Sequence, residues 1–335
     1  MADLAKQEAL VDQYINENKT EEALKLLFDL IVAHAKEKNF EKAEALNEKL
    51  YDVDPMALTE IVRAGEIIEE AKSESLDKEH LEIWADLYEN LSASEGNALY
   101  YSMKLREFEA GDPIVEQGAI DSRLYFINKG KIKAIFRKED EEKLLLTLGV
   151  GDIFGQDQFF SASVCTVSMI PLSRVKVACL DSDVLRKWKN DTPALESKLF
   201  DYCRYRDKIK QALGAKGMER REYTRTQLSG KMAFHLLDGA DKSIGKAYKG
   251  EIADFSPGGL SFLIKTSKPE TIRMLLGRRL QVKFDLVLKD GQRRSVDQAG
   301  HVIAVQCQAF DDFSIHLKFD TPLEQSLVET ITQGV

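Results

Sequence analysis

Residues 254–264 read DFSPGGLSFLI, a short polar turn that leads directly into an apolar strand. Glycine adopts backbone conformations that other residues avoid, so Gly258 and Gly259 permit a tight turn and let a ligand approach the backbone closely. Asp254 and Ser256 add short polar groups that suit the edge of a nucleotide base. The stretch therefore predicts a ligand-facing turn that opens a strand.

The sequence on both sides of this turn alternates between apolar and polar residues with the period of a β-strand. LQVKFDLVL (residues 280–288) and IHLKF (residues 315–319) show the pattern clearly. Short strands of this kind, about six in all, are typical of a small antiparallel barrel. We therefore predict a β-barrel over residues 218–335.

Positive charge is concentrated just before the barrel, although the chain of 335 residues carries a formal net charge of −9. Between residues 204 and 225, eight basic residues stand against three acidic ones, Asp207, Glu219 and Glu222. The basic residues are Arg204, Arg206, Lys208, Lys210, Lys216, Arg220, Arg221 and Arg225. Guanidinium groups can chelate phosphates through two parallel hydrogen bonds and can stack on purine faces. The segment therefore indicates a binding site for a phosphate-bearing ligand.

Two motifs connect this segment to the turn. Arg221 and Arg225 are spaced as Arg-x-x-x-Arg, and residues 254–259 are spaced as Asp-x-Ser-x-x-Gly. Both motifs, in this order, resemble the PilZ family of bacterial receptors for cyclic di-GMP. The resemblance covers residues 218–335 and includes the runs GLSFLI, GHVIAV and FSIHLKF. It predicts a six-stranded antiparallel PilZ β-barrel.

The resemblance also implies roles for the matching residues. Arg221 and Arg225 would hold the phosphates and guanine faces of cyclic di-GMP, and Arg220 adds a third cation that can help hold a stacked ligand dimer. Asp254 and Ser256 would read a guanine edge. The predicted set is Arg220, Arg221, Arg225, Asp254, Ser256 and Gly259. The alternative is a solvated basic linker followed by an ordinary loop.

One residue departs from the family pattern. His316 stands where the family usually has glycine in the last strand. We expect it to alter packing at most and to touch neither motif.

A second group of short strands lies between residues 93 and 182, where runs such as KIKAIF and VKVAC alternate and glycines separate them. The stretches FEAGDPIVEQG, RLYFINKGKI and GDIFGQDQFF resemble the cyclic-nucleotide-binding domain of catabolite activator proteins and cyclic-nucleotide-gated kinases. That resemblance predicts a β-roll with a site for a cyclic mononucleotide.

The cyclic-nucleotide site is degraded in this sequence. The family's phosphate-binding segment carries Phe-Gly-Glu, whose Glu binds the ribose hydroxyl, and then an Arg that pairs with the cyclic phosphate. Here Gly155 is followed by Gln156, and the Arg position aligns with Cys165, followed by Thr166. A thiol cannot neutralise a phosphate, and losing a bidentate Arg lowers affinity by roughly a hundredfold. We therefore expect a retained fold with degraded binding of cyclic AMP.

Residues 183–217 predict a long connecting helix and a hinge. Six positions recur at alternating spacings of four and three, namely Leu195, Leu199, Tyr202, Arg206, Ile209 and Leu213. This is a heptad seam with one charged interruption, and Gly214 and Gly217 then break the helix. Activator-like proteins dimerise through the corresponding helix, so the resemblance implies a homodimer. The alternative is that the stripe packs on the preceding β-roll.

Residues 1–92 read as helices with apolar stripes, for example Leu24, Leu27, Phe28 and Ile31. One stretch weakly resembles a tetratricopeptide helix, but a solenoid needs about three such units. We therefore expect an ordinary helical bundle, which offers a rival dimer interface. The predicted fold class is multidomain α+β, with a helical region at 1–92, a β-roll at 93–182, a connecting helix at 183–217 and the barrel at 218–335.

Composition disfavours several classes of function. The net charge of −9 argues against sequence-independent binding to DNA or to an anionic membrane. The four cysteines lie far apart and the five histidines form no metal or catalytic signature. We therefore expect no metal, no cofactor and no enzyme activity. The polar N-terminus and the lack of an apolar run of ~20 residues predict a cytoplasmic protein without membrane insertion.

The sequence thus predicts a non-enzymatic receptor that binds cyclic di-GMP, changes its interdomain arrangement and acts on a downstream protein. Two alternatives stay open. One is an interaction scaffold, and the other is a dual sensor that also binds a mononucleotide in the middle domain. A transcription factor is disfavoured, because a β-barrel stands where activators carry a helix-turn-helix.

Overall fold

The computed structural model describes residues 2–138, 141–215, 223–266, 271–272, 274–289, 291–307, 312–324 and 326. The chain divides into two compact units. The first comprises Met1–Met103 with Leu185–Leu199, and the second comprises Lys104–Val184 with Phe200–Val335. The predicted order is confirmed, because N-terminal helices precede a β-roll and the roll precedes a six-stranded barrel.

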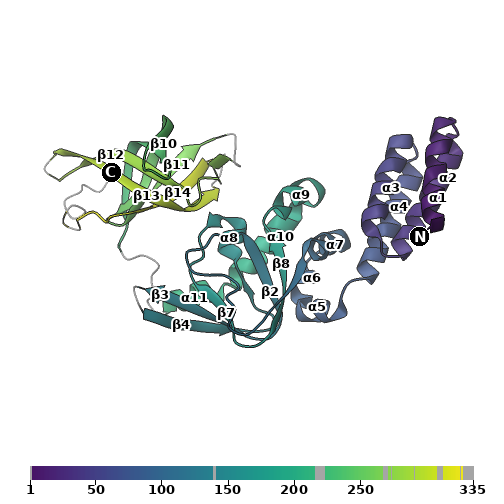
Figure 1. Ribbon diagram of the computed structural model, residues 1–335, viewed down its shortest axis with the longest axis horizontal. Helices are drawn as coiled ribbons and strands as arrows, with labels where there is room; N and C mark the ends of the chain where they lie inside the picture. Colours follow the sequence, from purple (N-terminus) through teal and green to yellow (C-terminus); the bar gives the residue numbers. More distant parts are fainter. Residues whose placement is uncertain are drawn as a thin grey trace. The chain divides into compact units, whose positions relative to one another are not determined.

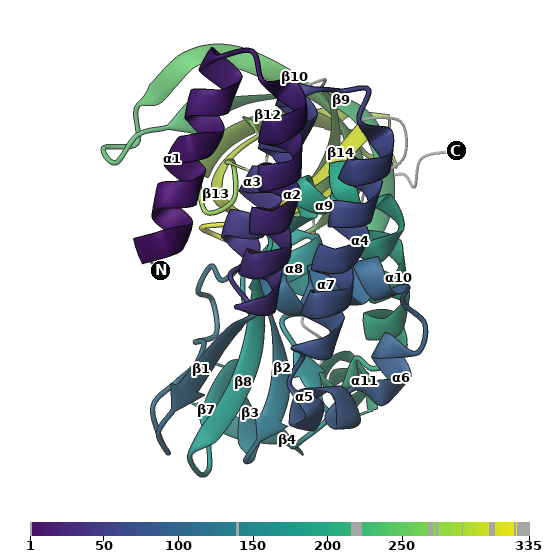
Figure 2. The ribbon, with the colours of Figure 1, turned by 90° about the vertical axis from the view of Figure 1, so that its right-hand side faces the viewer.

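Four N-terminal helices form a bundle, as their apolar stripes predict (Figures 1 and 2). They are α1 (Ala2–Asn16), α2 (Thr20–Lys36), α3 (Phe40–Val53) and α4 (Leu58–Glu74). Leu27 and Ile31 of α2 are buried in one core with Leu50 of α3 and Ile68 of α4. Each such side chain contributes about 1.5–3 kcal/mol when fully buried, so the stripes hold the bundle together.

Shorter helices complete the first unit. They are α5 (Lys78–Ile83), α6 (Ala85–Tyr88), α7 (Ala93–Ser102), α9 (Val184–Asp191) and the first part of α10 (Pro193–Tyr205). A capping box starts α7, because Ser92 Oγ accepts from the Glu95 N–H while the Glu95 carboxylate accepts from the Ser92 N–H. Glu95 also pairs with Lys198 Nζ at 2.7 Å, which ties α7 to α10.

The β-roll consists of two antiparallel sheets with strand orders β1-β8-β2-β5 and β4-β3-β7. Its elements are β1 (Lys104–Phe108), β2 (Arg123–Lys129), β3 (Ile132–Lys138), β4 (Glu141–Leu148), β5 (Ile153–Phe154), α8 (Gln156–Phe160), β6 (Ala162–Ser163), β7 (Ser168–Pro171) and β8 (Val175–Asp181). Alternate residues such as Ile132 and Ala134 enter the core, as the sequence pattern predicts.

The predicted connecting helix is not continuous. Residues 183–217 contain α9, α10 and α11 (Lys208–Ala215). Helix α10 ends at Tyr205, and Asp207 caps α11, because its Oδ1 accepts from the Lys210 N–H at 2.9 Å. The seam residues Leu195, Leu199, Ile209 and Leu213 are each at most 9% exposed within the single chain. Ile209 and Leu213 pack in the core of the β-roll. These four seam residues are therefore covered within the single chain, whereas Arg206 of the same seam is exposed.

The C-terminal domain is a closed antiparallel barrel with strand order β12-β9-β10-β11-β14-β13, in which β13 also pairs with β12. Its strands are β9 (Thr226–Leu237), β10 (Ser243–Ser256), β11 (Gly259–Lys265), β12 (Arg279–Val287), β13 (Arg293–Cys307) and β14 (Asp312–Phe319). Phe255 and Phe262 are fully buried in its core. Strand β6 adds to the sheet beside β13.

In the part of the chain that the structure describes, no helix combines the length and the apolar character required to cross a bilayer.

Candidate ligand-binding sites

A row of three side chains lies on the outer face of the barrel beside the DFSPGG turn. Strand pairing places Asp254 of β10 opposite Ser261 of β11, and Ser261 opposite His316 of β14. Their sequence neighbours Phe255 and Leu317 are buried in the barrel core. Because side chains alternate along a strand, the row faces outward.

Arg225 reaches this row from the segment that precedes β9. Its Nη1 lies 3.0 Å from Oδ1 and 3.1 Å from Oδ2 of Asp254. The same nitrogen lies 3.4 Å from Nδ1 of His316. Asp254 and His316 flank Ser261, so the guanidinium bridges over this small side chain, which is only 1% exposed. The second Arg of the Arg-x-x-x-Arg motif therefore contacts the Asp of the second motif.

The expectation that His316 touches neither motif is wrong. Its ring contacts Arg225, and its Nε2 lies 3.3 Å from Ser314 Oγ and 3.4 Å from Gln306 Oε1. A glycine has no side chain to make these contacts. The substitution therefore adds a polar connection that runs from Asp254 through Arg225 and His316 to β13.

The DFSPGG turn is shaped by close contacts. Ser256 is buried, and its Oγ donates to the Gly259 carbonyl oxygen at 3.2 Å. A side chain on Gly259 would overlap the Leu317 carbonyl oxygen, so the pairing of β11 with β14 requires glycine there. A side chain on Gly258 would overlap the ring of Tyr223. Tyr223, which stands between the two motif arginines in the sequence, thus lies against the turn.

The structure brings together four of the six residues predicted for cyclic di-GMP, namely Arg225, Asp254, Ser256 and Gly259. Arg220 and Arg221 lie outside the described residues. Sequence reasoning missed Ser261 and Tyr223. The position of Tyr223 between the two motif arginines was the one sequence signal that could have identified it. Ser261 could not be identified in this way, because its place beside Asp254 depends on the strand register.

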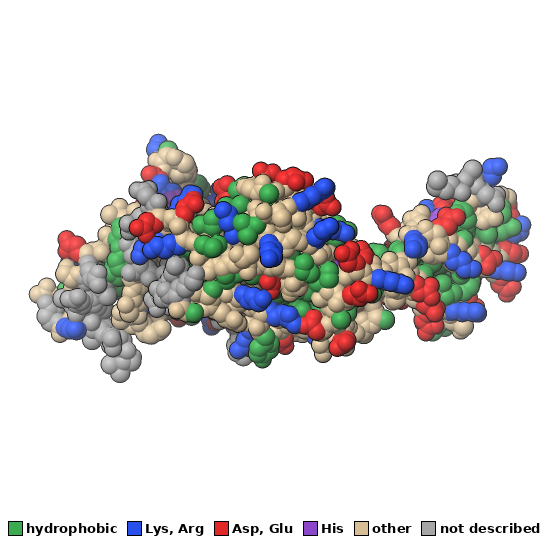
Figure 3. All heavy atoms as spheres, turned by 90° about the horizontal axis from the view of Figure 1, so that it is seen from below, with side chains coloured by type: hydrophobic (Ala, Val, Ile, Leu, Met, Phe, Trp, Pro, Cys, Tyr) green, Lys and Arg blue, Asp and Glu red, His purple; other side chains and the backbone are tan. Residues whose placement is uncertain are grey.

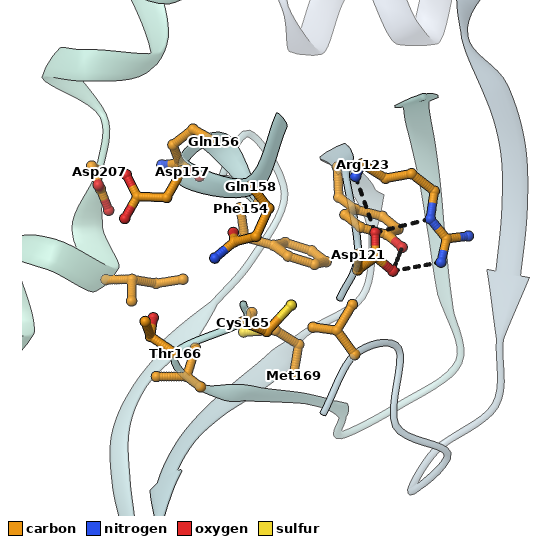
Figure 4. Close-up of a pocket in the computed structure, with 15 residues that line it drawn as sticks. Asp121, Arg123, Phe154, Gln156, Asp157, Gln158, Cys165, Thr166, Met169 and Asp207 are labelled. Carbon is orange, nitrogen blue, oxygen red and sulfur yellow. Dashed lines mark hydrogen bonds and ion pairs between the residues drawn. The ribbon is translucent and has the colours of Figure 1, made fainter. Parts of the chain in front are cut away.

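A pocket lies in the β-roll and is lined by all four residues of the predicted degraded site, Gly155, Gln156, Cys165 and Thr166 (Figure 4). Gly155 has a φ of 90°, and a side chain there would overlap the Arg123 carbonyl oxygen, so this turn requires glycine. Gln156 is 8% exposed, and its Nε2 has no hydrogen-bond partner. The pocket therefore combines a turn that depends on glycine with a buried amide nitrogen that has no hydrogen-bond partner.

The charges around this pocket oppose an anionic ligand. Among the described residues that line it, Arg123 is basic, whereas Asp121, Asp157 and Asp207 are acidic. Arg123 donates from Nε to Asp121 Oδ1 at 3.0 Å and from Nη2 to Asp121 Oδ2. Figure 4 shows its guanidinium on the far side of Asp121 from Cys165. The cation is therefore engaged away from the position that a cyclic phosphate would need.

Cys165 supplies no charge to replace the family's Arg. Burial raises the pKa of its thiol to about 11, and the nearby Asp121 acts in the same direction. The thiol is therefore neutral near pH 7 and cannot balance a phosphate.

Basic and acidic side chains are interspersed on the face shown in Figure 3. The described side chains on this face therefore form no broad positive area of the kind that binds a nucleic-acid backbone. Among the described residues, no three His, Cys, Asp or Glu side chains lie together in a group that could hold a metal ion.

The two sites belong to two regulatory domains arranged in series. Residues 105–191 match the family model of the cyclic nucleotide-binding domain. Residues 219–335 match the family model of the PilZ domain. The chain is therefore a protein with a cyclic nucleotide-binding domain followed by a PilZ domain.

Two curated relatives match parts of the chain. A CRP-like cAMP-activated global transcriptional regulator of Mycobacterium tuberculosis is 30% identical over 116 residues, which are 34% of this chain and 52% of the regulator. A cGMP-dependent protein kinase, isozyme 2, of Drosophila melanogaster is 36% identical over 78 residues, which are 23% of this chain and 8% of the kinase. The chain thus spans about half, or less, of the length of these relatives.

Two solved structures match parts of the chain at low identity. A cyclic nucleotide-binding domain from Methylobacillus flagellatus has a TM-score of 0.35 and 21% identity, and the match covers 43% of this chain and 79% of that one. The catabolite activator protein of Thermus thermophilus has a TM-score of 0.34 and 20% identity, and the match covers 39% of this chain and 62% of that one.

Proposed function

We propose that this chain is a non-enzymatic receptor for cyclic di-GMP and that the ligand binds at the barrel. The observation that carries the proposal is the contact between Arg225 and Asp254 at 3.0 Å. It joins two motifs that stand 29 residues apart in the sequence. A cation for phosphate and a carboxylate for a base edge thus stand side by side.

The chemistry of the two groups suits the two parts of the ligand. The planar Arg225 guanidinium can bind a phosphate through two parallel hydrogen bonds. The Watson–Crick edge of guanine carries N–H donors, and the Asp254 carboxylate is an acceptor for them. Arg220 and Arg221 supply further cations on the same segment. On binding, Asp254 exchanges part of its contact with Arg225 for the guanine edge.

Isothermal titration of the full chain with cyclic di-GMP tests this proposal. We expect saturable binding that weakens by roughly a hundredfold in Arg225→Ala and in Arg221→Ala, because each variant loses charged hydrogen bonds to phosphate. Arg293→Ala is the matched control, because Arg293 is exposed on β13 outside both motifs. Absence of binding by the unaltered chain, or wild-type affinity in both motif variants, would refute the proposal.

We assign no tight binding of cyclic AMP or cyclic GMP to the β-roll, which argues against the dual-sensor alternative. Three acidic residues and one engaged Arg123 line its pocket. Equilibrium dialysis with either mononucleotide should show no binding at micromolar concentration. Micromolar affinity that Gln156→Ala removes would contradict this assignment.

The receptor proposal includes a change in how the barrel is held. Helix α11 is anchored on the β-roll through Ile209 and Leu213 and ends at Ala215, six residues before Arg221. A ligand held by Arg221 and Arg225 therefore fixes the segment that tethers the barrel. It can favour one orientation of the barrel only by the difference between its binding free energies for the two orientations. Hydrogen exchange over residues 214–225 should slow with cyclic di-GMP. Equal exchange with and without the ligand would contradict this step.

The remaining assignments follow from the same proposal. The receptor acts on a downstream protein and does not bind DNA, an assignment that the net charge of −9 supports. Homodimerisation stays a prediction for light scattering to test. Leu199 is fully buried, so Leu199→Glu would disturb folding and is not a clean test of a dimer.

A further inference from the structure

We propose that His316 positions Arg225 for cyclic di-GMP by accepting a hydrogen bond from one nitrogen of its guanidinium; this inference rests on the proposed function. An Arg side chain carries five N–H groups, of which two are on Nη1. In the structure, Nη1 contacts both the Asp254 carboxylate and Nδ1 of His316. Both hydrogens of this nitrogen therefore have an acceptor.

The other two nitrogens of the Arg225 guanidinium are Nε and Nη2. Within the described chain, Arg225 forms no hydrogen bond other than those of Nη1 to Asp254 and His316. Toward the described residues, the edge formed by Nε and Nη2 therefore keeps its three N–H groups, which a ligand can use. A phosphate oxygen pair or a guanine edge can accept from this edge through two parallel hydrogen bonds.

The contact fixes the state of the imidazole. Arg is always a donor, so Nδ1 of His316 must be the acceptor and the ring must carry its proton on Nε2. The neighbours of Nε2 fit this assignment, because Ser314 Oγ at 3.3 Å and Gln306 Oε1 at 3.4 Å can both accept. These contacts orient the ring so that Nδ1 faces Arg225.

Strand register explains why the two anchors act together. Asp254 and His316 each lie opposite Ser261, on either side of it. The guanidinium is thus held from both sides above a small residue that leaves room for it. Asp254 alone is a weaker anchor, because the guanine edge competes for its carboxylate when the ligand binds. His316 keeps its hydrogen bond to Arg225 when the ligand binds. Its contribution to holding the guanidinium is therefore largest in the complex.

A pair of nearly isosteric variants separates this role from packing. In His316→Asn, the amide oxygen takes the place of Nδ1, so the acceptor is retained. In His316→Gln, the amide lies one bond farther out, in the place of Nε2, and the acceptor near Arg225 is lost. We expect His316→Asn to bind cyclic di-GMP within about twofold of wild type and His316→Gln and His316→Gly to bind about tenfold more weakly.

A double-mutant cycle completes the test. In an Arg225→Lys background, which replaces the planar fork with a single ammonium, His316→Gln should cause less than a twofold further loss. Thermal unfolding checks that each variant is folded. Wild-type affinity in His316→Gln, or equal losses in His316→Asn and His316→Gln, overturns the role of His316 while leaving the receptor proposal intact. Failure of the unaltered chain to bind cyclic di-GMP overturns both.

Discussion

Two arginines in this molecule, Arg225 in the barrel and Arg123 in the β-roll, each pair with an aspartate. They differ in which guanidinium nitrogens make the pair. Arg225 contacts Asp254 through Nη1 alone. Arg123 contacts Asp121 through both Nε and Nη2. A guanidinium that binds a carboxylate through one nitrogen can still donate two parallel hydrogen bonds to an anion from another edge. A guanidinium that binds a carboxylate through Nε and Nη2 already uses that edge. Retaining an Arg near a nucleotide pocket therefore does not by itself retain a phosphate site.

The largest effects should come from the two glycines that shape these sites. A methyl group on Gly259 would overlap the Leu317 carbonyl oxygen, and one on Gly155 would overlap the Arg123 carbonyl oxygen. We expect Gly259→Ala and Gly155→Ala each to lower the free energy of unfolding by about 3 kcal/mol, because backbone must shift in both cases. Denaturant unfolding measures this loss.

Binding separates the two glycine variants. Gly259→Ala should also abolish binding of cyclic di-GMP, whereas folded Gly155→Ala should retain it, as calorimetry can show. Loss of binding in Gly155→Ala would mean that the two sites are not independent.

The next effect is a gain of binding in the β-roll. Gln156→Glu combined with Cys165→Arg restores the ribose acceptor and the phosphate cation of the family pattern, and we expect at least about a tenfold increase in affinity for cyclic AMP. Cys165 lies near Asp121, which can partly neutralise the new Arg. Adding Asp121→Asn should therefore increase the affinity further. Cyclic di-GMP affinity is the control and should not change, and a triple variant without cyclic AMP binding would show that the pocket is closed for reasons other than charge.

The sequence predicted the features that depend on residues close together along the chain. Alternation marked the strands of both β domains, and two spaced motifs located Arg225, Asp254 and Gly259. The role of His316 could not be read in the same way, because it depends on the register that sets β14 beside β11. The break in the connecting helix was hidden for a different reason. The heptad spacing continues past Tyr205, where α10 ends, and only the hydrogen bond from the Lys210 N–H shows that Asp207 caps a new helix.

A smaller effect concerns the Tyr223 ring, which lies against Gly258. Tyr223→Ala removes this contact between the turn and a residue near Arg225 in the sequence, so the ligand must offset more of the ordering cost, and we expect cyclic di-GMP affinity to fall about threefold to tenfold. Tyr223→Phe keeps the ring and should bind as wild type. Tyr248→Ala is the matched control, because Tyr248 stacks on Phe234 elsewhere on the barrel. Equal affinities in all three variants would show that the ring does not order the segment.

The last test asks whether a cation lies beside the Cys165 thiol. Its thiol has a pKa of about 11, raised from 9.0 chiefly by burial. A pKa that is raised in the folded state means that the neutral thiol stabilises the fold below about pH 9, and that this contribution is lost as the pH rises from 9 to 11. Below pH 9, the difference in unfolding free energy between wild type and Cys165→Ser should be constant. Above it, the wild type should lose up to about 1.4 kcal/mol per pH unit relative to the variant, because the unfolded thiol ionises first. Denaturant unfolding of both proteins between pH 8 and 10 measures the difference. If the wild type instead becomes more stable relative to the variant as the pH rises, a nearby cation stabilises the thiolate. The conclusion that Arg123 is held by Asp121 and is not available at the pocket would then be wrong.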